Sequence, residues 1–409
     1  MRLASLDLLR TGIVFSSVTA GCAGTTTQLE PGRALTAVVR ADDSPPAPVW
    51  PEIARSPWPA TPLDERTRAL TSACGAADGA LARVAAKLAS ERAHGMGPPD
   101  PDRVTSLLRA QGEPHVRPRI VSASGRGAID DDAVRARLEA DRRPSTRCGV
   151  ALARPEAGNE GNERFVAVTV EALADLDPLP ARARTGEWLT FAAALHVPAT
   201  SAKLVVLGPR GLPRTVPTSI VDRAGGRVRA RFALDRPGAF TVQLVAELAT
   251  GPQPVLETRV FADVEPTDDD APSPAPGEDA VAGEDAAAVA RMTAALRASE
   301  SLPPLVRDER LDALALAHAE KMRDARTVAH DLGDGDLALR FESAGLAAKI
   351  VGENVARARS VALAHRALHA SPSHRMNLLR ADYTHLGVGV VTDESGNVHV
   401  CEVFAGGLR

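Results

Sequence analysis

The chain is poor in aromatic residues, which make up only 3% of its 409 residues. Its cores must therefore be built from Ala, Val and Leu, and aromatic stacking on nucleic-acid bases is not expected. Lysine is also scarce, because the 48 basic residues include only four lysines and form no basic block among the 52 acidic residues. With a formal net charge of −4, the chain has no electrostatic signature of a nucleic-acid partner.

Long apolar runs are absent too, and no stretch reaches the length of about 18 apolar residues that a membrane-spanning helix requires. At the N-terminus, Arg2 and Arg10 are followed by eleven uncharged residues. A positive start followed by a short apolar stretch and small residues is typical of a secretory signal, so we expect an exported protein with a signal peptide over residues 1–22.

The end of this signal, Ala20-Gly21-Cys22, resembles a bacterial lipoprotein cleavage site with Cys22 as the acylated residue. The alternative is an ordinary signal followed by a chance cysteine. The lipoprotein interpretation places the chain at the cell envelope, with a lipid at Cys22 as its only membrane attachment. The alternative places it in the extracellular space.

Cysteine is rare, with four residues in the chain and no CxxC spacing for zinc or redox chemistry. Three cysteines remain after Cys22, which in an exported chain suggests one disulfide and one free thiol. Cys74 and Cys148 flank one segment and are the expected pair. Cys401 lies in an alternating apolar run, where we expect a buried and unreactive thiol.

Two stretches of linker composition divide the chain. Residues 23–63 are rich in Thr, Pro and Gly and predict a disordered tether, because they cannot bury enough apolar surface to offset the entropy of ordering. Residues 266–285 are acidic and Pro-rich and predict a second linker that few contacts cross. We therefore expect a multidomain protein with folded domains at 64–177, 178–265 and 286–409.

The first two domains differ in pattern. Residues 64–177 show helical periodicity followed by two strand-like runs, which favours an α/β domain. Residues 178–265 contain short strand-like runs separated by turns, which favours an immunoglobulin-like β-sandwich acting as a spacer or adhesive module.

In residues 286–409, an apolar stripe at helical spacing runs from Leu311 to Met322 and includes His318, for which a packed core position is expected. Several short motifs also follow one another in this segment. They are Leu302-Pro303-Pro304-Leu305, Ala317-His318-Ala319-Glu320-Lys321-Met322, His330, Arg340, Gly345, Gly352-Glu353-Asn354-Val355, Ser371-Pro372-Ser373-His374-Arg375-Met376-Asn377 and Tyr383-Thr384-His385-Leu386-Gly387-Val388. In this order, the segment resembles the CAP superfamily of cysteine-rich secretory proteins, antigen five and plant pathogenesis-related proteins, in its short bacterial form.

The resemblance implies an α-β-α sandwich in which two histidines and two glutamates line a central cleft that can hold a divalent ion. Carried over by motif, His330 and His374 are the histidines, Glu353 is the first glutamate, and Asn377 lies in the motif of the second histidine. The second glutamate has no counterpart, because the matching stretch reads Arg366-Ala367-Leu368-His369-Ala370-Ser371. This chain therefore retains three of the four cleft residues that the resemblance implies.

Two imidazoles and one carboxylate match a zinc-like ligand set with an open position, which could polarise water or a carbonyl group. No cofactor is required, but we expect weak binding of a divalent ion such as zinc through His330 and His374. The alternative is that Glu353 and the histidines form a hydrogen-bonded scaffold without catalysis. Ser371 and Ser373 are poor serine-hydrolase candidates, because no base is expected to point toward them.

Members of the family are linked to sterol and lipid binding. The resemblance therefore implies a ligand-binding or interaction module, whose cleft residues His330, Glu353, His374 and Asn377 would hold an apolar small molecule, an envelope component or a peptide. A metal-dependent hydrolase or protease that uses the same cleft is the first alternative, and a structural surface protein is the second. The missing glutamate disfavours the enzyme, and the three retained positions disfavour the purely structural role.

The N-terminal domain repeats part of this outline. Residues 81–89 parallel residues 311–319, and residues 148–150 parallel residues 386–388. The N-terminal segment contains no Gly-Glu-Asn and no Ser-Pro-x-His motif. It is either a degenerate CAP-like copy without the cleft or a coincidence of pattern.

Overall fold

The computed structural model describes residues 49–50, 64–97, 101–125, 127–154, 162–222, 226–266, 274–279 and 283–409. The predicted signal peptide, Cys22 and most of the predicted tether lie outside the described residues. No helix within the described ranges is long and apolar enough to cross a membrane.

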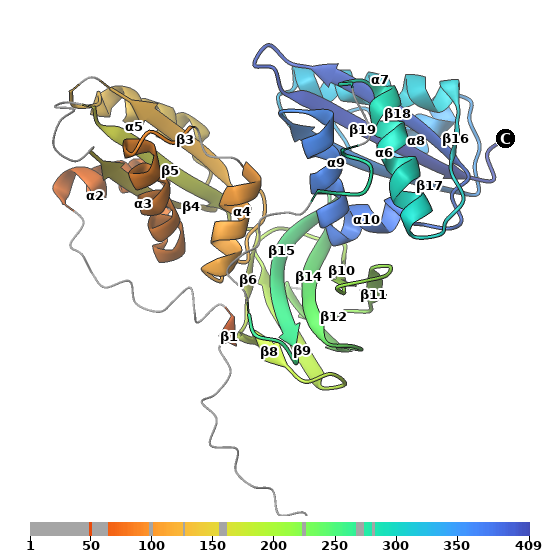
Figure 1. Cartoon of the computed structure of the whole chain (residues 1–409), viewed down its shortest axis with the longest axis horizontal. Coiled ribbons are helices and arrows are strands. Elements are labelled where there is room, and N and C mark those ends of the chain that lie inside the picture. The colour runs from red at the N-terminus through yellow and green to blue at the C-terminus, as the bar shows by residue number, and fades with distance from the viewer. Residues whose placement is uncertain are drawn as a thin grey trace, which may run out of the picture. The chain divides into compact units, whose positions relative to one another are not determined.

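The N-terminal domain has helices on both faces of a four-stranded sheet (Figure 1). Its elements are α2 (Glu65–Cys74), β2 (Ala76–Ala77), α3 (Gly79–Ala93), α4 (Pro101–Ala110), β3 (Arg119–Ser124), α5 (Asp131–Asp141), β4 (Thr146–Ala153) and β5 (Arg164–Glu171), with the strand order β2-β4-β5-β3. Helix α3 packs on the face that carries Val166 and Val168, and α2 and α5 pack on the face that carries Phe165 and Ala167. Successive side chains of β5 point to opposite faces of the sheet, and they therefore pack into two separate hydrophobic cores.

The structure joins Cys74 at the end of α2 to Cys148 in β4 through a disulfide, with Cα atoms 5.9 Å apart. Cys401 is a free and buried cysteine. The disulfide therefore ties a helix to the sheet of the N-terminal domain.

The central domain consists of two mainly antiparallel β-sheets around one core. Its strands are β6 (Ala174–Leu176), β7 (Leu179–Pro180), β8 (Arg182–Ala183), β9 (Trp188–Leu195), β10 (Ser201–Leu207), β11 (Arg214–Val216), β12 (Ser219–Asp222), β13 (Arg227–Ala233), β14 (Gly238–Leu248) and β15 (Gly251–Ala262). The sheets have the orders β11-β10-β14-β15-β8 and β12-β13-β9-β6, in which β8 pairs with β15 in parallel. Phe191 and Phe232 of one sheet share a core with Val206 and Phe240 of the other. A β-sandwich is therefore present, and its immunoglobulin-like character stays a prediction.

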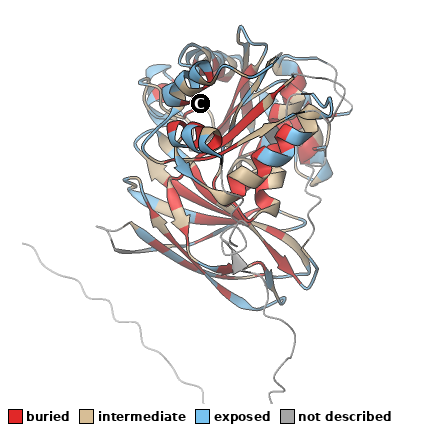
Figure 2. Ribbon diagram, turned by 90° about the vertical axis from the view of Figure 1, so that its left-hand side faces the viewer, coloured by how far each residue is buried: buried red, intermediate tan, exposed pale blue. Residues whose placement is uncertain are grey.

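The C-terminal domain is an α-β-α sandwich, as expected. Its elements are α6 (Ala286–Ser299), β16 (Val306–Arg307), α7 (Glu309–Asp324), α8 (Leu337–Ser343), β17 (Ile350–Ala358), α9 (Val361–Ala370), α10 (Pro372–Leu378), β18 (His385–Thr392) and β19 (Val398–Gly406). The sheet order is β16-β18-β19-β17. Helices α6 and α9 share a core with Val400 and Phe404, whereas α7 and α8 share another with Cys401 and Val403. Figure 2 shows the buried residues concentrated along the strands and on the helix faces turned toward them.

The N-terminal and C-terminal sheets have the same topology. Each has a short first strand that runs parallel to the next-to-last strand, and each ends in an antiparallel hairpin. Gly149 and Gly387 are equivalent, because a Cβ atom on either would collide with backbone of the helix above, at Leu81 and Leu311. Across the two sheets, the row Gly149, Val168, Ile120 thus corresponds to the row Gly387, Val403, Glu353.

The observed boundaries differ from the predicted ones in three places. Residues Val49–Trp50, inside the predicted tether, form strand β1 and pair with β7, because backbone hydrogen bonds need no apolar sequence pattern. Strand β6 precedes the predicted boundary at residue 178 and pairs with β9 of the sandwich. In the predicted linker, Glu278 is buried and forms an ion pair with Arg366 of α9. The linker therefore contacts the C-terminal domain.

Candidate functional site

Glu353 is the buried centre of the candidate site. It lies on β17, and its side chain is only 3% exposed. His330 Nδ1 lies 2.8 Å from Oε1, and Arg340 Nη2 lies 2.7 Å from Oε2. Burial raises the pKa of Glu353, but the hydrogen bond from His330 and the charge of Arg340 outweigh it and hold the pKa below its ordinary value of 4.5. Glu353 is therefore an ionised carboxylate with a partner on each oxygen.

His330 lies in the loop between α7 and α8. Arg340 donates a hydrogen bond to its backbone carbonyl. The two ring nitrogens of His318 face acceptors of the same loop, Asp334 Oδ2 at 3.1 Å and Ala329 O at 2.9 Å. His318 is 1% exposed and thus has the core position that its sequence pattern predicted. Since a carboxylate only accepts hydrogen bonds, the Nδ1 of His330 carries a proton and donates it to Glu353 Oε1.

His374 comes from the first turns of the short helix α10. Its Nδ1 lies 2.8 Å from the hydroxyl of Ser371. Desolvation, and after it the charges of His330 and Arg117, lower the pKa of His374 to about 3, so the ring is neutral at physiological pH. The expectation that no base points toward Ser371 was wrong, because the turn of α10 brings residue 374 back over residue 371. Among the described residues, no hydrogen bond joins His374 to a carboxylate, so a complete Ser-His-acid triad is not formed.

Asn377 positions the backbone of the site. Its Nδ2 donates to Glu353 O and to Asn354 Oδ1, both at 3.0 Å. Asn354 in turn donates to His374 O at 3.2 Å. Both N–H groups of the Asn377 side-chain amide are thus used within the protein, and Asn377 connects β17 to α10.

Glu402 is a buried carboxyl group that the sequence patterns did not single out. It lies on β19 with 0% exposure and accepts hydrogen bonds from Asn354 Nδ2 and Thr293 Oγ1, both at 3.0 Å. Burial raises its pKa from 4.5 to about 7. The available signal was an acidic residue inside the apolar run from Val398 to Phe404, in which every residue is buried.

The β-sandwich contributes to the edge of the site. Gly251, at the start of β15, has φ of 96°, and a Cβ atom there would lie 2.8 Å from His330 Cβ. Gln243 on β14 bonds to Ser371 and Ser373 beside His374. Sequence reasoning missed both residues, because contacts between domains leave no local pattern.

The residues do not fit a three-ligand metal centre. Among the described residues, no three His, Cys, Asp or Glu side chains gather in a way that could hold an ion. A cation at Glu353 would have to displace the guanidinium of Arg340 and the N–H of His330. In the predicted zinc site of His330, Glu353 and His374, the carboxylate of Glu353 is therefore not free to bind a metal ion.

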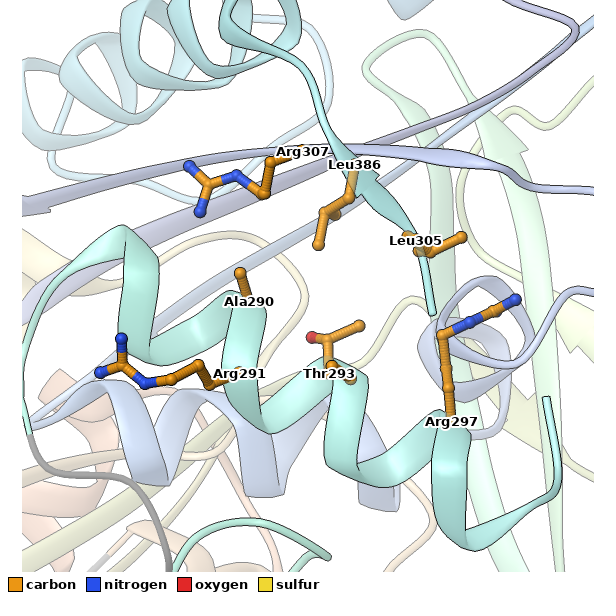
Figure 3. A pocket seen from close by; sticks show the side chains of 8 residues that line it. Ala290, Arg291, Thr293, Arg297, Leu305, Arg307 and Leu386 are labelled. Carbon is orange, nitrogen blue, oxygen red and sulfur yellow. The ribbon is translucent and has the colours of Figure 1, made fainter. Parts of the chain in front are cut away.

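A separate hollow lies beside α6, and its volume is about 160 Å³. Figure 3 shows Ala290 and Leu386 lining this hollow and the guanidinium groups of Arg291 and Arg297 on opposite sides of it. Sites for drug-sized ligands enclose roughly 300–1,000 Å³, so this hollow is too small for a sterol. It is lined by Ala290, Arg291, Thr293, Ala294, Arg297, Leu305, Arg307 and Leu386.

Comparisons with known proteins agree with the sequence motifs. Residues 290–404 match the family model of the cysteine-rich secretory protein (CAP) family. The uncharacterized protein YkwD of Bacillus subtilis is 34% identical over 112 residues, which are 27% of this chain and 43% of that protein. This chain therefore matches less than half of that relative's length.

Solved structures include similar proteins from two other bacteria. An extracellular protein containing an SCP domain from Bacillus anthracis is 18% identical, with 53% of this chain and 81% of that chain covered at a TM-score of 0.28. A cysteine-rich secretory protein from Staphylococcus aureus is 13% identical, with 56% and 86% covered at a TM-score of 0.25. Given the family match over residues 290–404, the C-terminal domain of this chain is a CAP domain of the cysteine-rich secretory protein family.

Proposed function

We propose that this chain is an exported bacterial binding protein of the cell envelope, and that its CAP domain binds a peptide at the cleft formed by His330, Glu353 and His374. The observation that carries this proposal is the state of Glu353, which is ionised, buried and held on both oxygens. Such a carboxylate orients His330 and is not available as a metal ligand or a nucleophile. The cleft therefore supports recognition better than metal-dependent hydrolysis.

A peptide suits the groups that the cleft offers. His374 is a neutral imidazole, which can donate one hydrogen bond and accept another. An amide group has the complementary donor and acceptor. In addition, a turn of this chain itself, at Gly251, already packs against His330.

We also propose that the N-terminal domain is a degenerate CAP-like copy that acts as a scaffold. The shared sheet order and the equivalence of Gly149 with Gly387 support this. Ile120 occupies the register position of Glu353, so the copy lacks the central carboxylate. It would therefore bind no ligand in the manner of the C-terminal cleft.

The proposed binding function can be tested by selection from a random peptide library displayed on phage, with EDTA in the buffer. We expect the wild-type chain to enrich a defined set of sequences. The double variant His330→Leu/His374→Leu should not enrich them. His94→Leu is the matched control, because His94 is exposed in the N-terminal domain.

Equal enrichment by the wild-type chain and the double variant would show that the peptides bind elsewhere. Enrichment that needs added zinc in place of EDTA would favour the metal-dependent alternative. Attachment at the envelope is tested separately: in a bacterial host, Cys22→Ser should move the chain out of the membrane fraction and remove the mass of the acyl chains. An unchanged distribution and mass would exclude the lipid anchor.

A further inference from the structure

Gln243 links the β-sandwich to the CAP cleft. It lies on β14 and is 1% exposed. Its Nε2 donates to Glu257 Oε2 at 2.7 Å and to Ser371 Oγ at 3.2 Å, and its Oε1 accepts from Ser373 N at 3.1 Å. Every hydrogen-bonding group of this amide therefore has a partner.

The partners fix the orientation of the Gln243 amide. The carboxylate of Glu257 can only accept, so the amide nitrogen must face it, and the backbone N–H of Ser373 can only donate, so the amide oxygen must face that group. Glu257 is itself held by Arg109 of the N-terminal domain, whose Nη2 lies 3.1 Å from Oε1. A flipped amide would break two of these hydrogen bonds.

The fixed amide occupies one of the two acceptor positions of the Ser371 hydroxyl. Because Gln243 donates to Ser371 Oγ, the hydroxyl proton is free to be donated to another group. His374 Nδ1 lies 2.8 Å away, whereas Ser373 Oγ lies 3.5 Å away and is too distant for a good hydrogen bond. The Nδ1 of His374 is thus the better placed of these two acceptors, and accepting that proton would leave the ring proton on Nε2.

We propose that Gln243 is a positioning residue that fixes the tautomer of His374, through Ser371, with the proton on Nε2. The cleft then carries a hydrogen-bond donor on the Nε2 of His374. Such a donor matches a neutral acceptor such as the carbonyl oxygen of an amide. The part that concerns the ligand rests on the proposed function, whereas the tautomer does not.

The tautomer can be measured on the full chain by NMR with 15N-labelled histidine. Long-range 1H–15N correlations distinguish the two tautomers, and the His374→Asn variant identifies the signals of His374. We expect the wild-type chain to show the Nε2-protonated form. Gln243→Leu and Ser371→Ala should each shift the 15N signals toward a mixture of tautomers. Thr215→Val is the matched control, because Thr215 contacts Met376 of α10 without joining this chain of hydrogen bonds.

An Nδ1-protonated ring in the wild-type chain would overturn the proposal, and so would an unchanged tautomer in both Gln243→Leu and Ser371→Ala. For a peptide selected on the wild-type chain, Gln243→Leu should weaken affinity by roughly threefold to tenfold, as expected for one hydrogen bond. If the tautomer shifts as expected but no peptide binds the wild-type chain, the proposed function fails and the positioning role of Gln243 stands.

Discussion

Replacing Glu402 by glutamine should stabilise the CAP domain at alkaline pH. Glu402 is fully buried, and its two hydrogen-bond partners are uncharged, namely Asn354 and Thr293. Glutamine has nearly the same shape. Its oxygen can accept from Asn354, and its NH₂ group can donate to the hydroxyl of Thr293. The substitution therefore removes a charge and keeps a hydrogen bond to each of the two partners.

The size and sign of the effect follow from the pKa of Glu402, which burial raises from 4.5 to about 7. At a pH below 4.5, Glu402 is protonated in both the folded and the unfolded state, so its burial does not lower the free energy of unfolding through ionisation. As pH rises from there toward the folded pKa, only the unfolded state loses the proton, so the free energy of unfolding falls. The full penalty, on the order of 3 kcal/mol, is present above the folded pKa and is absent in the Glu402→Gln variant.

Tyr383 provides a probe for this domain alone. It is the single tyrosine of the chain, and it stacks on Phe404 with ring centroids 5.4 Å apart. With 3-fluorotyrosine incorporated, 19F NMR in increasing urea gives the folded fraction of the CAP domain in the full chain. We expect Glu402→Gln to unfold at higher urea than the wild-type chain at about pH 8, and the difference to shrink by about pH 5.

Glu394→Gln is the matched control, because Glu394 is exposed in the turn between β18 and β19. It should leave the urea midpoint unchanged at both pH values. If Glu402→Gln is less stable than the wild-type chain at about pH 8, the ionised carboxylate must be a net stabilising group, and the reasoning from burial is refuted.

Two further predictions concern the ion pair of the site and the cysteines. Arg340→Met should destabilise the CAP domain by about 3–5 kcal/mol in the same urea assay, because it leaves Glu353 buried without its cation, and Glu353→Gln added to it should recover part of the loss. A loss below about 1 kcal/mol would show that Glu353 needs no counter-charge. Mass mapping under non-reducing conditions should join Cys74 to Cys148, and Cys401 should resist alkylation until the chain unfolds, since burial raises the pKa of its thiol. A bridge that contains Cys401 would contradict this arrangement.

The sequence predicted the parts of the site that depend on ordered motifs. The motifs led to His330, Glu353 and His374, and the structure connects His330 to Glu353 through a direct hydrogen bond. The motif list also contained Arg340, but spacing could not show that its guanidinium would occupy the second oxygen of Glu353. That contact depends on how α8 packs beside β17, which only the folded chain determines.

Other features had a weak sequence signal or none. Glu402 is one acidic residue in a strand whose other residues, apart from His399, are apolar, and a strand of alternating pattern is normally taken to have one exposed face. Gln243 and Ser371 are 128 residues apart and belong to different domains, so no periodicity relates them. Strand β1 formed within a Pro-rich stretch because pairing with β7 uses backbone groups alone.

The most direct test of the central claim is a calorimetric titration of a library-selected peptide into the full chain, first with EDTA and then with zinc. The arrangement of His330, Glu353 and Arg340 predicts the same affinity in both buffers, and a loss on the order of tenfold or more in the variant His330→Leu/His374→Leu. Binding that appears only with zinc, or that survives unchanged in the double variant, would contradict it.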